Sequence, residues 1–189
     1  MSSRRSTILL LLALSLVLMA CGGGNQPASV SWRNVTLQMP DGWYVFEEEE
    51  TRLSISNADI GPEAMRGADL DDDEVEIAND VVAMFFTFEP RASPADWRAY
   101  AEQQDATVES DEQIVIGDEV PATRIVMNYV TDDVPLREMV VVVPSRRIVV
   151  LAQPVPRAGQ QDGPEVFLDH VDTFIEVLDT AQFGAPVME

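Results

Sequence analysis

Residues 140–152, VVVVPSRRIVVLA, decide the fold. Residues 140–143 and 148–152 are continuously apolar, so both faces of each segment are apolar. A strand of this kind must be covered on both sides. Residues 144–147 have the composition of a turn. The stretch therefore predicts a β-hairpin within a sheet that has cover on both faces.

Residues 80–89 repeat the double-sided pattern. One face would carry Val82, Met84, Phe86 and Phe88, and the other Val81, Ala83 and Phe85. Further strands are expected at residues 35–39, which end at Pro40-Asp41-Gly42, and at 43–46 and 52–56, joined through four glutamates. Residues 113–116 and 122–130 predict another hairpin, through Gly117-Asp118.

Two segments predict helices. In residues 93–104, Ser93 suits the N-cap, Pro94 the first helical position and Asp96 the acidic position three residues after the cap. Trp97, Tyr100 and Ala101 then share a face. A second helix is expected from about Gly163, where an apolar stripe is spaced at 4, 3 and 4 residues: Phe167, Val171, Phe174 and Leu178.

These elements predict one α+β domain. An antiparallel sheet of about six or seven strands would carry helices on both faces, as an α/β/α sandwich of three layers. The chain has 189 residues, which suits one such domain over residues 32–183, followed by a tail at 184–189.

Composition excludes several classes of protein. The net charge is −21, from 12 basic and 33 acidic residues, so a nucleic-acid-binding surface is excluded as the main function because it would repel phosphate. One cysteine excludes an intramolecular disulfide and a cysteine-based zinc cluster. We expect no cofactor.

The first 20 residues have the pattern of a secretory signal: Arg4 and Arg5 precede an apolar run over residues 8–20. Leu18-Met19-Ala20-Cys21 resembles the lipobox of bacterial lipoproteins. In that family the cysteine thiol receives a diacylglyceryl group and becomes residue one after cleavage. The resemblance implies lipidation of Cys21 and attachment to a cell membrane, facing the periplasm or exterior. The polar segment that follows, from Gly22 to Ser29, has no apolar pattern and predicts a flexible tether over residues 21–31. A plain signal followed by an unmodified cysteine is the alternative.

The rest of the chain resembles the PsbP-like superfamily, including lipoproteins of the DcrB and LpqN kinds. The similarity covers about residues 30–183. It rests on the Pro40–Trp43 turn, the Ser93-capped helix, the Gly117–Thr123 turn with Val120-Pro121-Ala122, and two long strands before a terminal helix. It implies an accessory or binding domain. That superfamily has no common catalytic motif, so no catalytic residue is assigned and we do not expect an enzyme.

An acidic loop over about residues 58–79 is the candidate cation site. Asp69, Asp71, Asp73 and Asp80 occupy positions one, three, five and twelve of an EF-hand-like loop. Glu74 replaces the required glycine and Asp80 is shorter than the usual glutamate, so the loop is not an EF-hand. A loose calcium site is one alternative, and a solvated loop is the other.

Five further residues are candidates for binding or catalysis, and each also has a structural interpretation. His170 suits either a hydrogen-bonded boundary position or catalysis, and the first is expected. Arg146 and Arg147 could dock an acidic partner, although a solvated hairpin tip is the default. Trp43 and Tyr44 are expected in the core. The leading hypothesis is a non-catalytic, lipid-anchored accessory or binding domain outside the cytoplasm, with an envelope protein as the candidate partner. A cation-binding module and a carboxylate-dependent hydrolase are the alternatives.

Overall fold

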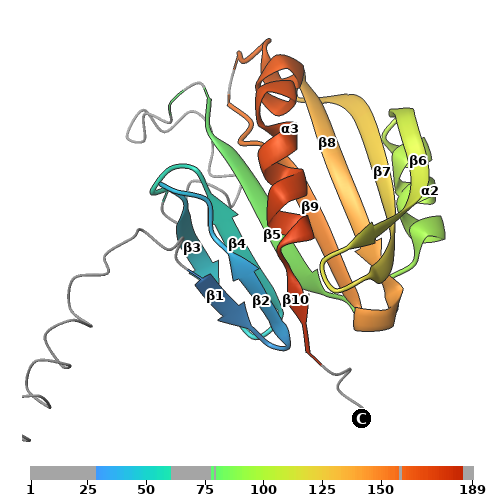
Figure 1. Cartoon of the computed structure of the whole chain (residues 1–189). Helices are drawn as coiled ribbons and strands as arrows, with labels where there is room; N and C mark the ends of the chain where they lie inside the picture. The colour runs from blue at the N-terminus through green and yellow to red at the C-terminus, as the bar shows by residue number, and fades with distance from the viewer. Residues whose placement is uncertain (1–28, 61–77, 79, 158, 185–189) are drawn as a thin grey trace, which may run out of the picture.

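The computed structural model describes residues 29–60, 78, 80–157 and 159–184. Its main element is a seven-stranded antiparallel sheet in the order β3-β4-β5-β9-β8-β7-β6 (Figure 1). The strands are β3 (Tyr44–Glu48), β4 (Arg52–Ser56), β5 (Val82–Phe88), β6 (Thr107–Ile116), β7 (Val120–Thr131), β8 (Val134–Val143) and β9 (Ile148–Pro154). The predicted α+β class and antiparallel sheet are confirmed.

The hairpin predicted over residues 140–152 lies inside this sheet. β8 and β9 pair antiparallel through the 3₁₀ turn η1 (Pro144–Arg146). Val140 and Val142 join the apolar cluster on one face of the sheet, whereas Val141 and Val143 join the cluster on the other face. All four are fully buried, as their double-sided pattern predicts.

The two helices cover opposite faces of the sheet. Helix α3 (Gly163–Asp179) packs Phe167 and Phe174 into the larger cluster. Helix α2 (Pro94–Gln103) packs Ala101 into the cluster on the other face. The expected cap is present, since the Ser93 side chain accepts a hydrogen bond from the Ala95 amide at 3.2 Å.

A second, small sheet was not expected. It has the order β1-β2-β10, with β1 (Ser29–Trp32), β2 (Val35–Gln38) and β10 (Gln182–Phe183). It lies beside α3 and shares its apolar cluster (Figure 1). The strand predicted at residues 35–39 therefore belongs to this sheet and not to the main one.

The fold also begins earlier than the tether range implied. β1 occupies residues 29–31 of that range, because it pairs with β2 and is held by Trp32. The Trp32 indole is buried and donates to the Glu49 carbonyl at 2.7 Å. On β5, Phe86 is 1% exposed as predicted, but Phe85 is only half-buried and packs edge-to-face on Phe46.

Candidate functional site

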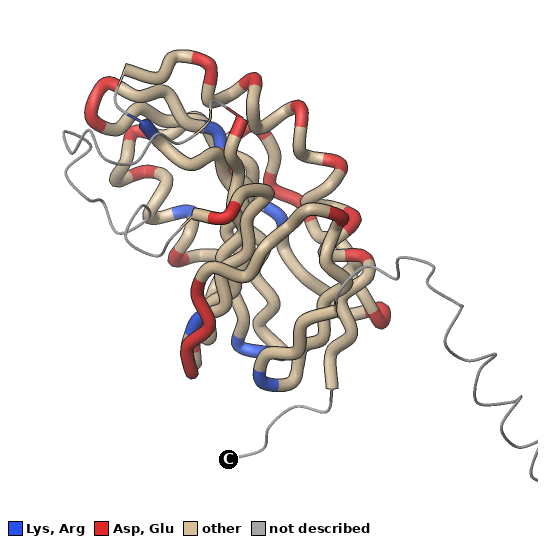
Figure 2. Tube along the Cα trace, turned by 90° about the vertical axis from the view of Figure 1, so that its left-hand side faces the viewer, with Lys and Arg blue, Asp and Glu red and all other residues tan. Residues whose placement is uncertain are grey.

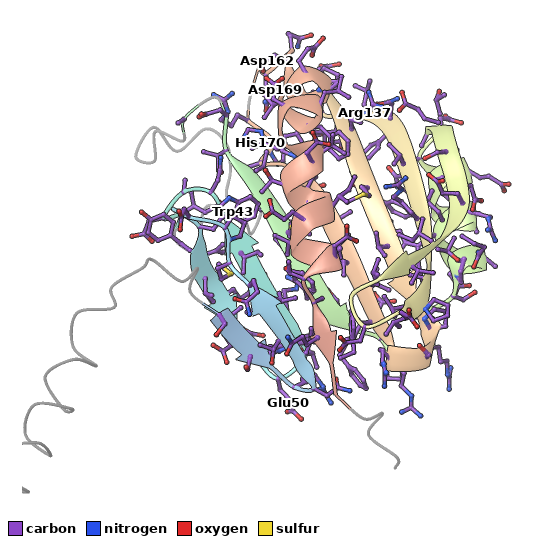
Figure 3. All side chains as sticks on the ribbon, in the orientation of Figure 1. Trp43, Glu50, Arg137, Asp162, Asp169 and His170 are labelled. Carbon is purple, nitrogen blue, oxygen red and sulfur yellow. The ribbon has the colours of Figure 1, made fainter. Side chains whose placement is uncertain are left out.

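The outer face of α3 carries an uninterrupted row of carboxylates. The members of this acidic face recur at alternating spacings of three and four residues and are all exposed: Asp162, Glu165, Asp169, Asp172, Glu176 and Asp179. That spacing places them on one side of the helix. Figure 2 shows the acidic residues following one another along this helix, and Figure 3 shows Asp162 and Asp169 near its start.

The acidic face is not neutralised within its own helix, because α3 contains neither Lys nor Arg. Like charges at spacings of three and four destabilise a helix by about 0.2–0.5 kcal/mol per pair. The helix dipole favours negative charge at the start of α3, where Asp162 and Glu165 lie, and disfavours it at the C-terminal end, where Glu176 and Asp179 lie. Leu168, half exposed at 50%, lies at the edge of the same face. The outer side of α3 is therefore electrostatically costly for this domain.

A contrasting distribution is found on β6, where the carboxylates are paired. Asp111 accepts from Arg98 at 2.9 Å, and Glu112 from Arg124 at 2.7 Å. Glu109 pairs with Arg137 and also accepts from the Asn128 amide. The Asp111–Arg98 hydrogen bond lowers the pKa of Asp111. Charge is thus compensated at this edge of the main sheet, whereas α3 has no Lys or Arg of its own.

An open cleft of about 650 Å³ lies at the end of the sheet where α2 ends and α3 begins. Its lining includes Gln104, Glu109, Tyr129, Arg137 and Pro164. Arg137 also stacks over the Phe167 ring, with its guanidinium carbon 5.5 Å from the ring centroid. Glu109 and Arg137 form an ion pair, and Asp105 is the third charged residue of the lining.

Most of the residues that the sequence singled out as cation ligands or as a lipid site lie outside the described part of the chain. These are Cys21, Asp69, Asp71 and Asp73. Asp80 is described and exposed, and its carbonyl accepts a hydrogen bond from Asn57. Within the described residues, no three His, Cys, Asp or Glu side chains come together in a way that could hold a metal ion. The cation site therefore stays a prediction.

His170 occupies a hydrogen-bonded boundary position, as expected. Its Nδ1 lies 2.9 Å from the Val166 carbonyl, which can only accept, so Nδ1 carries the proton. Its Nε2 lies 3.4 Å from the Asn57 amide nitrogen and accepts from it. Both ring nitrogens of His170 (Figure 3) are thus used in structural contacts.

Arg146 does not form a solvated hairpin tip. It donates to the Gly184 carbonyl at 2.9 Å and lies over the Phe183 ring, so it holds β10 against the end of the main sheet. Trp43 packs edge-to-face on Phe174, as expected of a core residue. The expectation for Tyr44 was wrong, because its side chain is 45% exposed. It lies on β3, at the edge of the sheet.

Sequence reasoning missed Glu138. This side chain is 1% exposed on β8 and accepts a hydrogen bond from the Tyr129 hydroxyl at 2.7 Å. Burial raises the pKa of Glu138 to about 7, against the opposite effect of that hydrogen bond. The signal was present, since Glu138 alternates with Leu136 and Val140 and so had to face the interior with them.

No protein-family model matches this chain, and no curated protein matches it. None of the described helices is long and apolar enough to cross a membrane.

Proposed function

We propose that this chain is a lipid-anchored accessory or binding domain outside the cytoplasmic membrane. It would bind a basic partner, such as an envelope protein, through the acidic face of α3. The proposal assigns no catalytic step and no cofactor. The observation that carries the binding part of the proposal is the row of exposed carboxylates on α3, a helix that has no Lys or Arg.

The lipid anchor is supported by the N-terminal sequence. The only cysteine of the chain, Cys21, follows the apolar run and completes the Leu-Met-Ala-Cys motif. A single acyl chain holds a protein only marginally, whereas two anchor it stably. The first strand begins at Ser29, and eight residues span at most about 29 Å when fully extended. The folded domain would thus stay close to the membrane surface.

The assignment to the PsbP-like superfamily is supported by the order of the helices and strands. A seven-stranded antiparallel sheet with one helix on each face agrees with the sandwich that the PsbP-like resemblance implies. The capped helix before β6 and the terminal helix after β9 occupy the places that the resemblance assigns. We propose a PsbP-like domain on this basis.

Binding of a basic partner is supported by electrostatics. Binding a basic surface would remove the mutual repulsion of the six carboxylates, so the cost carried by the free helix would be recovered in the complex. Leu168 would supply an apolar contact beside the charges. Such complementarity favours rapid association that weakens as salt is added.

A site-specific cross-linking experiment tests the binding face in the cell. A photo-reactive residue replaces Leu168 on α3 in one variant and Val115 on β6 in another; both side chains are exposed, at 50% and 61%. We expect a discrete cross-linked product from position 168 and none from position 115. Equal products from both positions, or none from 168, would contradict the proposal.

Charge neutralisation supplies the second arm. Asp169→Asn, Asp172→Asn and Glu176→Gln together remove three charges from the acidic face, and Glu48→Gln, Glu49→Gln and Glu50→Gln remove three from the β3–β4 turn. We expect the first set to abolish cross-linking from position 168 and the second to leave it intact. If both sets act alike, net charge and not the α3 face governs binding.

A further inference from the structure

Helix α2 covers a buried carboxyl group. Glu138 lies on β8 with Val140 and Val142, and the two valines belong to the apolar cluster beneath α2. The Glu138 side chain is 1% exposed. Its neighbour Arg137 alternates to the other face, where it lies over Phe167. Glu138 is therefore a lone acid within the layer between the sheet and α2.

This carboxyl is hydrogen-bonded to one tyrosine and lies near a second, which belongs to the helix. Its Oε2 accepts from the Tyr129 hydroxyl of β7 at 2.7 Å. Tyr129 and Tyr100 of α2 pack against the same apolar cluster, and each shifts the pKa of the other. The second oxygen, Oε1, is buried and has no hydrogen-bond partner among the described residues. One oxygen of the carboxyl thus has a hydrogen-bond partner, and the other has none among the described residues.

Among the described residues, no cation lies where it could neutralise this carboxyl. From α2 and β7 the titratable groups that face it are Tyr100 and Tyr129, and burial raises the pKa of both, with the charge of Glu138 as the second cause. From β9, the same face carries the apolar Val149 and Leu151. β6 contributes Asp111, which is already paired with Arg98 of α2.

Near the start of α2, Glu89 and Asp96 are the remaining acids. Burial and then the charge of Asp96 raise the pKa of Glu89. Every acid on this side other than Glu138 is at least partly exposed, so water can solvate its charge. An ionised Glu138 would instead be an unpaired charge under the helix, which costs free energy as long as the helix stays closed.

Of the two helices, α2 is the less firmly held. It has ten residues, of which Ala101 alone is buried, while Trp97 and Tyr100 are half-buried. Helix α3 buries six. Elements with few buried contacts open with a smaller free energy than the rest of a domain. A modest electrostatic cost can therefore act on α2 without unfolding the sheet.

We infer that α2 is a proton-controlled cover: it closes on the sheet while Glu138 is neutral and opens when Glu138 ionises, uncovering Trp97, Tyr100 and the apolar strip of β7 and β8. The inference does not depend on the lipid anchor or on the acidic face of α3. At the location proposed above, outside the cytoplasm, such a cover would respond to the pH of the surroundings.

Hydrogen exchange of the full chain in detergent solution, measured by mass spectrometry from pH 5 to pH 8, tests this inference. The pKa of Glu138 is about 7 under the closed helix and 4.5 in water. The closing equilibrium should then fall as the pH rises, by about 300-fold in all, of which about 70-fold lies between pH 5 and pH 8. We expect α2 amides to lose protection, corrected for intrinsic exchange, while α3 amides keep theirs.

Glu138→Gln keeps the shape and removes the charge, so its α2 protection should not change with pH. Glu102→Gln, an exposed acid on α2 itself, is the matched control and should behave like the wild type. Constant α2 protection in the wild type, or equal loss in α2 and α3, overturns the inference even if Glu138→Gln fails to fold. A pH-dependent loss that persists in folded Glu138→Gln overturns it as well.

Discussion

Replacing Phe174 with alanine should destabilise the domain by about 3–5 kcal/mol. The side chain is 0% exposed and lies at the centre of the α3 contact with the sheet. Its ring centroid is 6.3 Å from that of Trp43 and 5.6 Å from that of Phe167. Alanine would remove both aromatic contacts, each contributing about 0.5–1.5 kcal/mol beyond burial, and would leave a cavity between two large rings.

Urea unfolding, followed by circular dichroism, gives the free energy difference if the slope of the transition is unchanged. Leu168→Ala is the control on the same helix, because Leu168 is 50% exposed; it should cost less than about 0.5 kcal/mol. A cost below about 1 kcal/mol for Phe174→Ala, or equal costs for the two variants, would refute the packing of α3 described above.

Three more predictions concern charge. The pKa of Glu138 in the folded state is raised from 4.5 to about 7, so its stabilising contribution is full below about pH 4.5 and is lost as the pH rises to about 7. Glu138→Gln should therefore reduce the pH dependence of the urea unfolding midpoint over that range. An unchanged pH profile in the variant would contradict this. With a net charge of −21, the melting temperature should rise between about 0.01 and 0.1 M sodium chloride, as the Debye length falls from about 30 to 10 Å; a flat or falling melting temperature argues against self-repulsion. At matched ionic strength, calcium should raise the midpoint further only if the acidic loop binds it, and Asp71→Asn with Asp73→Asn should abolish that rise; equal midpoints in both salts remove the calcium module.

Local patterns were sufficient to predict the main sheet and both helices. The valines of β8 and the apolar residues of β9 leave no polar face, so cover on both sides followed from the sequence alone. Ser93 and Pro94 marked the start of α2 because capping is a local interaction. Helix α3 followed from the spacing of its apolar stripe, of which Phe167 and Phe174 are fully buried.

The small sheet could not be predicted because it depends on contacts between the two ends of the domain. β10 has two residues, Gln182 and Phe183, which pair with Thr36 and Val35 of β2. No periodicity exists in so short a strand, and its position is set by α3 and by the Arg146 contact with Gly184. Residues 29–31 were assigned to the tether for the same reason, because a strand this short shows no periodicity.

The candidate sites divide along a similar line. The sequence shows that the acidic residues of α3 recur at spacings of three and four. Their importance depends on which side of the helix faces solvent, and only the structure shows that. Glu138 needed the pairing of β8 with β7, which brings it to Tyr129, and the position of α2, which brings in Tyr100. Such a network joins residues from three elements, and sequence spacing alone does not show it.

The most direct test of the central proposal, that this is a membrane-anchored binding domain, is the intact mass of the chain purified from the membranes of its host. The account predicts a mature protein that begins at Cys21 and carries a diacylglyceryl group on its thiol. Cys21→Ser should lose the lipid and move to the soluble fraction. An unmodified Cys21 in the wild-type protein, or a Cys21→Ser variant that stays as firmly membrane-bound as the wild type, would contradict the lipid anchor.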